Sequence, residues 1–184
     1  MTGLLFHFFT FIISLPARLK GMRLGKGSMI GPGYDWIFVT LQGVVLGDFV
    51  VIGQNAWIQI VSYGGMHGKI FVGNGTQIGR GAVISAIDSV VIGSKCLLSY
   101  HVSIFDHDHE VTNVNISPMD SGISQNEPVT IEDHCFIGAH TFILKGVHLG
   151  KHCVVGANSV VTKSFPRYSV IAGNPARLIR SLKP

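Results

Sequence analysis

Residues 131–161 read IEDHCFIGAHTFILKGVHLGKHCVVGANSVV, and an aliphatic residue recurs in this stretch at every sixth position. Those positions are Ile131, Ile137, Ile143, Leu149, Val155 and Val161. Six residues suffice for one short strand and one turn, but not for the helix that crosses over in an ordinary parallel sheet. The period therefore predicts a chain that winds into stacked coils.

The same period runs through most of the chain before this stretch. A glycine commonly follows the aliphatic residue, and a small or β-branched residue commonly lies four places after it. Three hexads close one triangular coil of about 18 residues, and such coils stack at the inter-strand spacing of about 4.8 Å. We expect an all-β parallel β-helix over residues 24–165. The earlier aliphatic positions are Leu24, Ile30, Leu46, Ile52, Ile58, Val72, Ile78, Ile84, Ile92, Leu98 and Ile104.

All three cysteines of the chain, Cys96, Cys135 and Cys153, fall at the small position of the hexad. That position points inward, where a thiol behaves as a small hydrophobe. An odd number of cysteines without CxxC spacing argues against a disulfide framework and against a zinc knuckle. We expect a structural role for the cysteines and a reducing, cytoplasmic location for the protein.

The hexad count fails between Ile104 and Ile131, where the sequence is polar, acidic and interrupted by prolines. We expect an extruded loop over residues 105–130, and a smaller excursion between Ile58 and Val72. Loops on a rigid scaffold commonly carry function. The loop opens with DHDHE at residues 106–110, which by its chemistry is a solvated turn, a metal site, or a histidine base oriented by a carboxylate.

Charge is strongly segregated along the chain. Residues 106–133 hold seven of the ten acidic residues and no Lys or Arg, whereas the residues after Asp133 hold seven basic residues and no acid. The basic end lacks interleaved surface aromatics and any nucleic-acid-binding motif. We expect it to bind a phosphate-bearing small molecule and not a nucleic acid.

The last segment, Ser169 to Arg177, reads SVIAGNPAR. Gly173 indicates a turn, Asn174 an N-cap and Pro175 the first residue of a helix. We therefore predict a short C-terminal helix within a tail of residues 166–184, with Arg177 and Arg180 facing an anion.

The pattern aliphatic-Gly-x-x-small-x and the DHDH loop resemble the hexapeptide-repeat acyltransferases, in particular the maltose, galactoside and xenobiotic O-acetyltransferases. The resemblance implies a left-handed helix and a catalytic histidine five residues after the aliphatic residue that closes the coil, which is His109 rather than His107. Asp108, Asp106 or a backbone carbonyl would hold the tautomer of its ring, and Asp108 and His107 complete the candidate catalytic residues. The Asn and Asp that hold the sugar in those relatives correspond here to Gly81 and Ala86, so the acceptor would be bound differently.

The C-terminal segment resembles the acetyl-CoA end of the same family. That resemblance implies acetyl-CoA as co-substrate, a homotrimer with its active site between subunits, and no catalytic metal. It places the basic residues near phosphate groups and the alanines beside the pantetheine arm. The implied cofactor contacts are Ala139, Ala157, Thr162, Lys163, Arg177 and Arg180.

The apolar stretch from Leu4 to Leu15 is shorter than the ~20 residues that a spanning helix needs, and the basic residues follow it instead of preceding it. We expect residues 1–23 to form either a hydrophobic cap over the first coil or an interfacial helix, with residues 4–15 contacting the membrane peripherally.

The hydrophobic start and the DHDH loop also resemble the acetyltransferases of polysaccharide and lipopolysaccharide synthesis. The resemblance implies an acetyl-CoA-dependent O-acetyltransferase that acts on a sugar hydroxyl in surface polysaccharide or lipopolysaccharide biosynthesis. A streptogramin-type acetyltransferase would use the same chemistry. A gamma-type carbonic anhydrase, with zinc on His101, His107 and His109, and a non-catalytic scaffold are alternatives from other classes.

Overall fold

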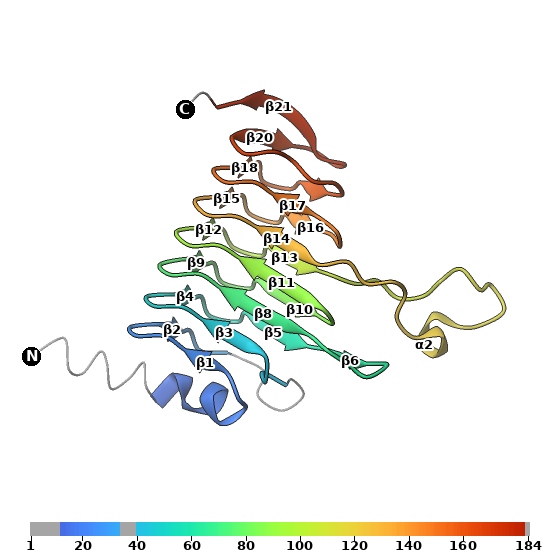
Figure 1. The fold of residues 1–184 in the computed structure, drawn as a ribbon, viewed down its shortest axis with the longest axis horizontal. Coiled ribbons are helices and arrows are strands. Elements are labelled where there is room, and N and C mark those ends of the chain that lie inside the picture. The colour runs from blue at the N-terminus through green and yellow to red at the C-terminus, as the bar shows by residue number, and fades with distance from the viewer. Residues whose placement is uncertain (1–11, 34–39, 183–184) are drawn as a thin grey trace, which may run out of the picture.

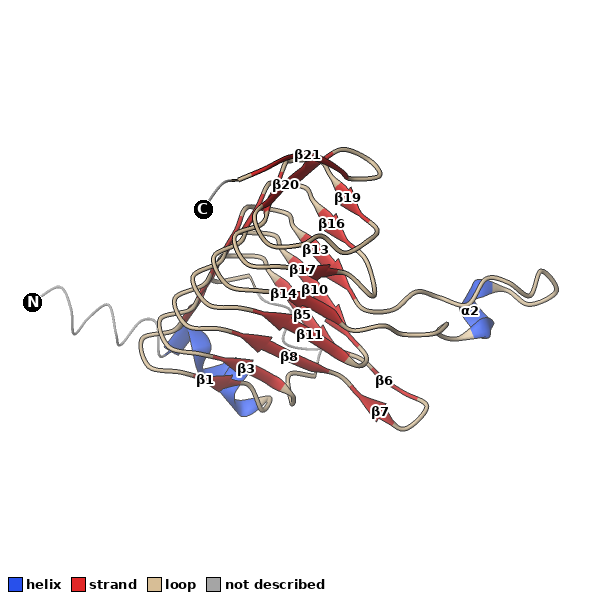
Figure 2. Ribbon diagram, turned by 45° about the horizontal axis from the view of Figure 1, so that its top comes forward, coloured by secondary structure: helices blue, strands red, loops and turns tan. Residues whose placement is uncertain are grey.

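The computed structural model describes residues 12–33 and 40–182. Its strands are two to five residues long, and apart from one two-stranded hairpin they stack into three sheets that form the faces of a triangular prism (Figures 1 and 2). Neighbouring strands in these sheets are parallel, except for the last pair of the chain. Between residues 44 and 161 the chain visits face 1, face 2 and face 3 in turn, and each full circuit adds one strand to every face. This is the parallel β-helix that the hexad period predicts.

The members of each face follow one another along the helix axis. Face 1 contains β1 (Arg23–Leu24), β3 (Val44–Leu46), β8 (Lys69–Val72), β11 (Ser89–Ile92), β14 (Val129–Ile131) and β17 (His148–Leu149). Face 2 contains β2 (Met29–Ile30), β4 (Val51–Ile52), β9 (Gln77–Ile78), β12 (Leu97–Leu98), β15 (Phe136–Ile137), β18 (Val154–Val155), β20 (Ser169–Ala172) and β21 (Arg177–Ser181). Face 3 contains β5 (Trp57–Ile60), β10 (Val83–Ala86), β13 (Ser103–Phe105), β16 (Phe142–Ile143) and β19 (Val160–Val161).

The strand register aligns the aliphatic residues of successive coils, which explains why these positions stabilise the fold. On face 3, Ile84 pairs with Ile58 on one side and with Ile104 on the other, and all three side chains are fully buried. The helix interior is thus a column of like residues, and burying each of these side chains contributes about 1.5–3 kcal/mol. The three cysteines occupy the inward column as predicted, each at most 2% exposed.

Two excursions leave the same corner of the prism, between face 3 and face 1 (Figure 2). The first is a hairpin of β6 (Ser62–Tyr63) and β7 (Met66–His67) that turns at two glycines with positive φ, which confirms the smaller break predicted in the hexad count. The second is the long loop after β13, which carries the single helical turn α2 (Pro118–Ser121). Both predicted excursions are therefore real.

The predicted C-terminal helix is wrong. Residues Arg177–Ser181 form strand β21, which pairs antiparallel with β20 after the turn at Gly173. The edge of β20 would otherwise present unpaired backbone groups, and a helix of so few residues is not stable alone. Pairing with the sheet edge therefore overrides the local capping pattern.

Before the first coil, residues 12–19 are helical. Ser14, Ala17 and Met22 are buried against the first coil, so this segment covers the end of the core. Part of the predicted membrane segment, residues 4–11, lies outside the described residues. No helix in the described ranges is long and apolar enough to cross a bilayer.

Candidate active site

The long loop begins as a paired stem. Its outgoing arm, residues 106–110, and its returning arm, residues 122–127, are joined by backbone hydrogen bonds at three levels. The amides of Glu110, Ser124 and Glu127 donate to the carbonyls of Gly122, Asp108 and Asp106, at 3.1, 2.9 and 2.9 Å. The base of the loop is therefore fixed relative to the helix, while the residues beyond the stem project outward (Figure 1).

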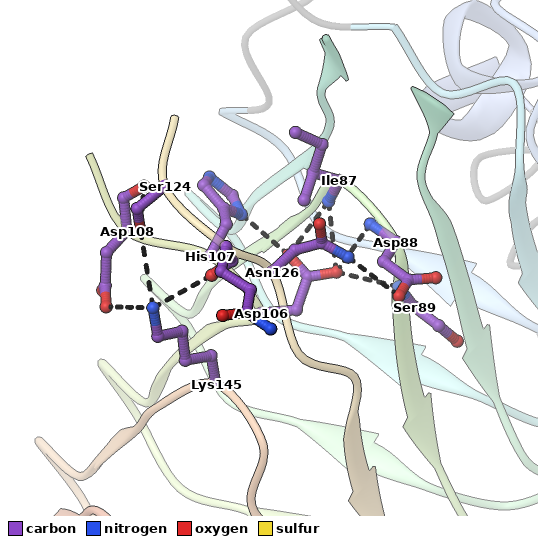
Figure 3. Close-up of polar contacts among 10 residues, drawn as sticks. Ile87, Asp88, Ser89, Asp106, His107, Asp108, Ser124, Asn126 and Lys145 are labelled. Carbon is purple, nitrogen blue, oxygen red and sulfur yellow. Dashed lines mark hydrogen bonds and ion pairs between the residues drawn. The ribbon is translucent and has the colours of Figure 1, made fainter. Parts of the chain in front are cut away.

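Asp106 is the anchor of this stem. Its side chain is fully buried, and its carboxylate accepts hydrogen bonds from the backbone amides of Ile87, Asp88 and Ser89 in the preceding coil, at 2.8–3.1 Å (Figure 3). Burial opposes ionisation of Asp106, but the hydrogen bonds from His107 and from the amides of Ile87 and Asp88 outweigh it, so its pKa lies below the ordinary value. The carboxylate is therefore a fixed negative charge at the foot of the loop.

His107 is held by that charge. Its Nδ1 lies 2.7 Å from Asp106 Oδ1, and its side chain is only 12% exposed (Figure 3). Because the carboxylate only accepts, Nδ1 carries the hydrogen of a neutral ring and Nε2 is left as an acceptor; this tautomer is inferred from the contact. A buried carboxylate that orients an imidazole is the arrangement of a general base.

Asp108 and His109 have different surroundings. Asp108 Oδ2 forms an ion pair with Lys145 Nζ at 3.1 Å, and the same ammonium donates to the Gln125 carbonyl at 2.9 Å (Figure 3). Lys145 thereby ties both arms of the loop to the next coil. His109 is exposed, and its ring makes no hydrogen bond to any residue of the described ranges. The carboxylate that the sequence placed beside His109 is thus engaged with Lys145.

A cavity of about 510 Å³ lies against this loop base. His107, Asp108 and His109 all line it, so the structure brings the three predicted catalytic residues to one site. Opposite them lie side chains from the outer surface of face 3 and one from the returning arm. These residues are Trp57, Gln59, Val61, Ser85, Phe105 and Ile123.

The predicted cofactor residues lie on later coils and form three groups. Ala139 and Ala157 occupy the same corner between faces 2 and 3 on adjacent coils, where the Asn158 amide donates to the Ala139 carbonyl at 2.8 Å. Arg177 and Arg180 are exposed on β21. Thr162 and Lys163 follow β19 and are exposed.

Lys163 is related to the loop base by the register of face 3. Ser103, Phe142 and Val160 pair in series, so Asp106, Lys145 and Lys163 occupy equivalent places on successive coils. Two coil spacings amount to about 10 Å. The loop base and Lys163 therefore lie along one edge of the prism.

Four other histidines, His101, His134, His140 and His152, occupy turns of the β-helix. His134 stacks on His152 with ring centroids 4.8 Å apart, as the hexad register predicts, and His101 stacks on His140 at 5.0 Å. His101 is thus part of a turn stack and does not join His107 and His109 in the cavity. Within the described part of the chain, no three His, Cys, Asp or Glu side chains converge as metal ligands.

Sequence reasoning did not identify Trp57, Gln59, Ser85 or Lys145 as site residues. Trp57 and Gln59 flank a buried aliphatic position of β5, so alternation could have placed them on the outer surface. The partners that Asp106 and Lys145 find depend on how the loop leaves the coil, which no local pattern encodes.

Comparison with known proteins agrees with the repeat. A family profile described as the hexapeptide repeat of succinyl-transferase matches residues 128–163. The chain is 31% identical over 134 residues to a galactoside O-acetyltransferase of Escherichia coli, covering 73% of this chain and 64% of that protein. It is 36% identical over 120 residues to a putative lipopolysaccharide biosynthesis O-acetyl transferase, WbbJ, of the same organism, covering 61% of each. The chain thus spans less than two thirds of both relatives.

The fold also matches solved structures. AntD, an N-acyltransferase from Bacillus cereus crystallised with dTDP and 3-hydroxybutyryl-CoA, superposes with a TM-score of 0.71 at 20% identity, over 90% of this chain and 86% of that one. At this identity the likeness concerns the fold alone. The predicted left-handed parallel β-helix is confirmed.

Proposed function

We propose that this chain, a member of the hexapeptide-repeat acetyltransferase family, transfers an acetyl group from acetyl-CoA to a sugar hydroxyl. The observation that carries the proposal is the buried Asp106 carboxylate, which holds His107 by Nδ1 at the edge of a cavity of about 510 Å³. The names of the relatives supply the acyl chemistry and the saccharide class of acceptor.

In the proposed reaction His107 Nε2 accepts the proton of an acceptor hydroxyl as its oxygen attacks the thioester carbonyl of acetyl-CoA. A C–O bond forms, a tetrahedral oxyanion collapses, the C–S bond breaks, and the imidazolium returns its proton to the departing thiolate. Asp106 stabilises the imidazolium and fixes the ring. No redox change or metal is needed for this balance.

The choice between the two imidazoles follows from their surroundings. The resemblance selects His109, and that assignment stays a prediction. Proton abstraction requires a ring whose tautomer and orientation are fixed. His107 has that support from Asp106 at 2.7 Å, whereas Asp108, the neighbour of His109, pairs with Lys145. We therefore assign the base to His107 and treat His109 as the second candidate.

Acetyl-CoA is the proposed co-substrate, and its anionic groups would lie toward the basic carboxyl-terminal coils. Lys163, Arg177 and Arg180 are exposed there, and Ala139 with Ala157 would leave room for the pantetheine arm. Lys163 shares an edge of the prism with the loop base, which supports a path from phosphates to imidazole. A homotrimer with the site between subunits is part of the proposal.

The acceptor we propose is a sugar of a surface polysaccharide, of lipopolysaccharide or of a precursor of either. The printed name of the WbbJ relative supports this class. Gly81 stands where the sugar-binding Asn is expected, and it has a positive φ beneath the ring of His101, so a side chain there would collide. The acceptor must therefore be held by other residues.

Two matched substitutions test the assignment. We expect His107→Gln to lower kcat for acetyl transfer by about 100- to 10,000-fold, the range of a general base. We expect His109→Gln to change kcat by less than about tenfold and both variants to bind acetyl-CoA like the parent. Thiol release with galactosides and glucosides as acceptors measures kcat, and calorimetric titration measures binding.

Each result has one meaning. A large loss in His109→Gln with activity retained in His107→Gln transfers the role of base to His109, and the transferase proposal stands. Full activity in both variants contradicts an imidazole base. Parent protein that neither binds acetyl-CoA nor releases thiol from it contradicts the transferase.

A peripheral position at the inner membrane face is the last element of the proposal. In the helical segment 12–19, Ile12, Leu15 and Leu19 are exposed, Leu19 by 79%, on the side away from buried Ala17. Exposed Arg18 and Arg23 lie near them, a combination suited to anionic lipid. Co-sedimentation of the parent, but not of Leu19→Glu, with phosphatidylserine vesicles is expected, and equal sedimentation of both excludes this surface.

A further inference from the structure

The floor of the active-site cavity is a regular part of the β-helix. On β5, Ile58 and Ile60 are buried, so Trp57 and Gln59 face outward. Gln59 pairs in register with Ser85 of β10, and Ser85 pairs with Phe105 of β13. Gln59, Ser85 and Phe105 therefore form a row across three coils, which leads from Trp57 toward the loop that carries His107.

This floor combines an aromatic surface with polar groups. The Trp57 side chain is 42% exposed, so much of it is open to a ligand. Gln59 adds an amide beside it, Ser85 adds a hydroxyl that is 5% exposed, and Phe105 and Ile123 add apolar surface nearer the loop. An aromatic surface with a few polar groups at fixed places is typical of small-molecule sites.

The charge of the lining limits what can bind. Among the described residues that line this cavity, Asp108 is the sole ionisable side chain apart from the two imidazoles, and Lys145 forms an ion pair with it at 3.1 Å. No Lys or Arg from residues 12–33 or 40–182 belongs to the lining. A phosphate or carboxylate placed here would lose its hydration without gaining a cationic partner, which is costly.

We infer that Trp57 is the platform for a neutral pyranose ring of the acceptor, which stacks on the indole and presents a hydroxyl toward His107. A pyranose has an apolar C–H face and a rim of hydroxyl groups, which match the indole and the Gln59–Ser85 pair respectively. This inference rests on the proposed function and narrows its substrate class to uncharged sugars. It also explains how the chain binds an acceptor without the Asn and Asp of its relatives.

Fluorescence tests the platform without any turnover. The chain has two tryptophans, so Trp36→Phe makes Trp57 the single reporter. We expect methyl β-D-galactopyranoside or methyl α-D-glucopyranoside to change the emission saturably. N-acetylneuraminic acid and glucose 6-phosphate should bind at least about tenfold more weakly. Equal or tighter binding of the charged sugars overturns the inference, and so does an emission unchanged by all four.

Kinetics provide the second measurement. Trp57→Ala is expected to raise KM for the neutral glycoside by about tenfold, Trp57→Phe by less, and neither should alter KM for acetyl-CoA. Phe71→Ala is the matched control, because Phe71 is an aromatic of similar exposure, 44%, on the outer surface of face 1. An unchanged acceptor KM in Trp57→Ala, with turnover still dependent on a loop histidine, removes the platform and leaves the transferase proposal standing.

Discussion

The chain passes the corner between faces 3 and 1 differently in two neighbouring coils. After β10 the chain turns tightly through Ile87 and Asp88 into β11, whereas after β13 it leaves the helix at Asp106 and returns only at Val129. Elsewhere, the amide of one coil donates to a carbonyl of the next, as Val61 does to Ala86 and Lys69 to Asp88. The backbone amides of the tight turn after β10 do not have such a carbonyl partner, because the chain of the next coil leaves the helix at Asp106.

The departing chain replaces the missing carbonyls with a side chain. The Asp106 carboxylate accepts the amides of Ile87, Asp88 and Ser89 and also the ring of His107. Buried backbone donors are rarely left unpaired. The Asp106 carboxylate therefore both satisfies the backbone amides of the tight turn and orients the proposed base. The stability of this corner is thus linked to the proposed catalysis.

The largest change in the free energy of unfolding is expected from a substitution in the buried interior of the coils. Ile104 is fully buried between Ile84 and Ile143, so Ile104→Ala should lower the free energy of unfolding by about 2–5 kcal/mol. Ile104→Val, the matched control, should cost about 0.5–1.5 kcal/mol. Urea denaturation followed by circular dichroism measures both. Equal costs for the two variants would show that the column relaxes around the missing atoms.

An intermediate change in the free energy of unfolding is expected from a substitution at Asp106, where the chain leaves the coil. Asp106→Asn removes a charge that accepts three backbone amides, and we expect a loss of about 1–3 kcal/mol at pH 7. The exposed Asp120→Asn is the control and should be neutral. Urea denaturation at pH 7 compares them.

Acid pH sharpens the same comparison. The folded-state pKa of Asp106 is lowered, so its stabilising contribution is complete above the ordinary carboxylate pKa of about 3.9 and fades as pH falls below it. The gap in unfolding free energy between parent and Asp106→Asn should therefore narrow below about pH 4. A gap that stays constant down to pH 2 would contradict an ionised Asp106.

The contrast between the two regions also explains what could be predicted from sequence. The hexad period depends on local strand and turn chemistry, so the inward aliphatic column, the buried cysteines and the stacking of His134 on His152 all follow from counting. The position of the long loop and its opening DHDH residues could also be predicted, because the hexad period is interrupted there. The support that Asp106 gives to His107 could not be predicted in this way. Asp106 is held in place by backbone amides that lie 17–19 residues earlier in the chain.

The C-terminal error has the same origin. Gly173, Asn174 and Pro175 satisfy every local rule for a turn followed by a helix, yet the segment after them meets the free edge of β20. A long-range partner overrode a correct local pattern there. Trp57 was missed for a related reason: its position on β5 is an ordinary outward one, and it lines a cavity only because the stem of the long loop places His107, Asp108 and Ile123 against it.

The smallest effect is expected at the tip of the loop, beyond the stem. Met119 is 91% exposed and belongs to α2, a single turn capped by Ser117. Met119→Ser should change the free energy of unfolding by no more than about 0.5 kcal/mol, because substitutions at exposed positions are usually nearly neutral. Urea denaturation at several protein concentrations checks this. A loss above about 1 kcal/mol that grows with dilution would show that another copy of the chain covers the tip, since stability of an assembly depends on concentration. In that case the outward loop would be fixed by assembly in the way that Asp106 fixes its base.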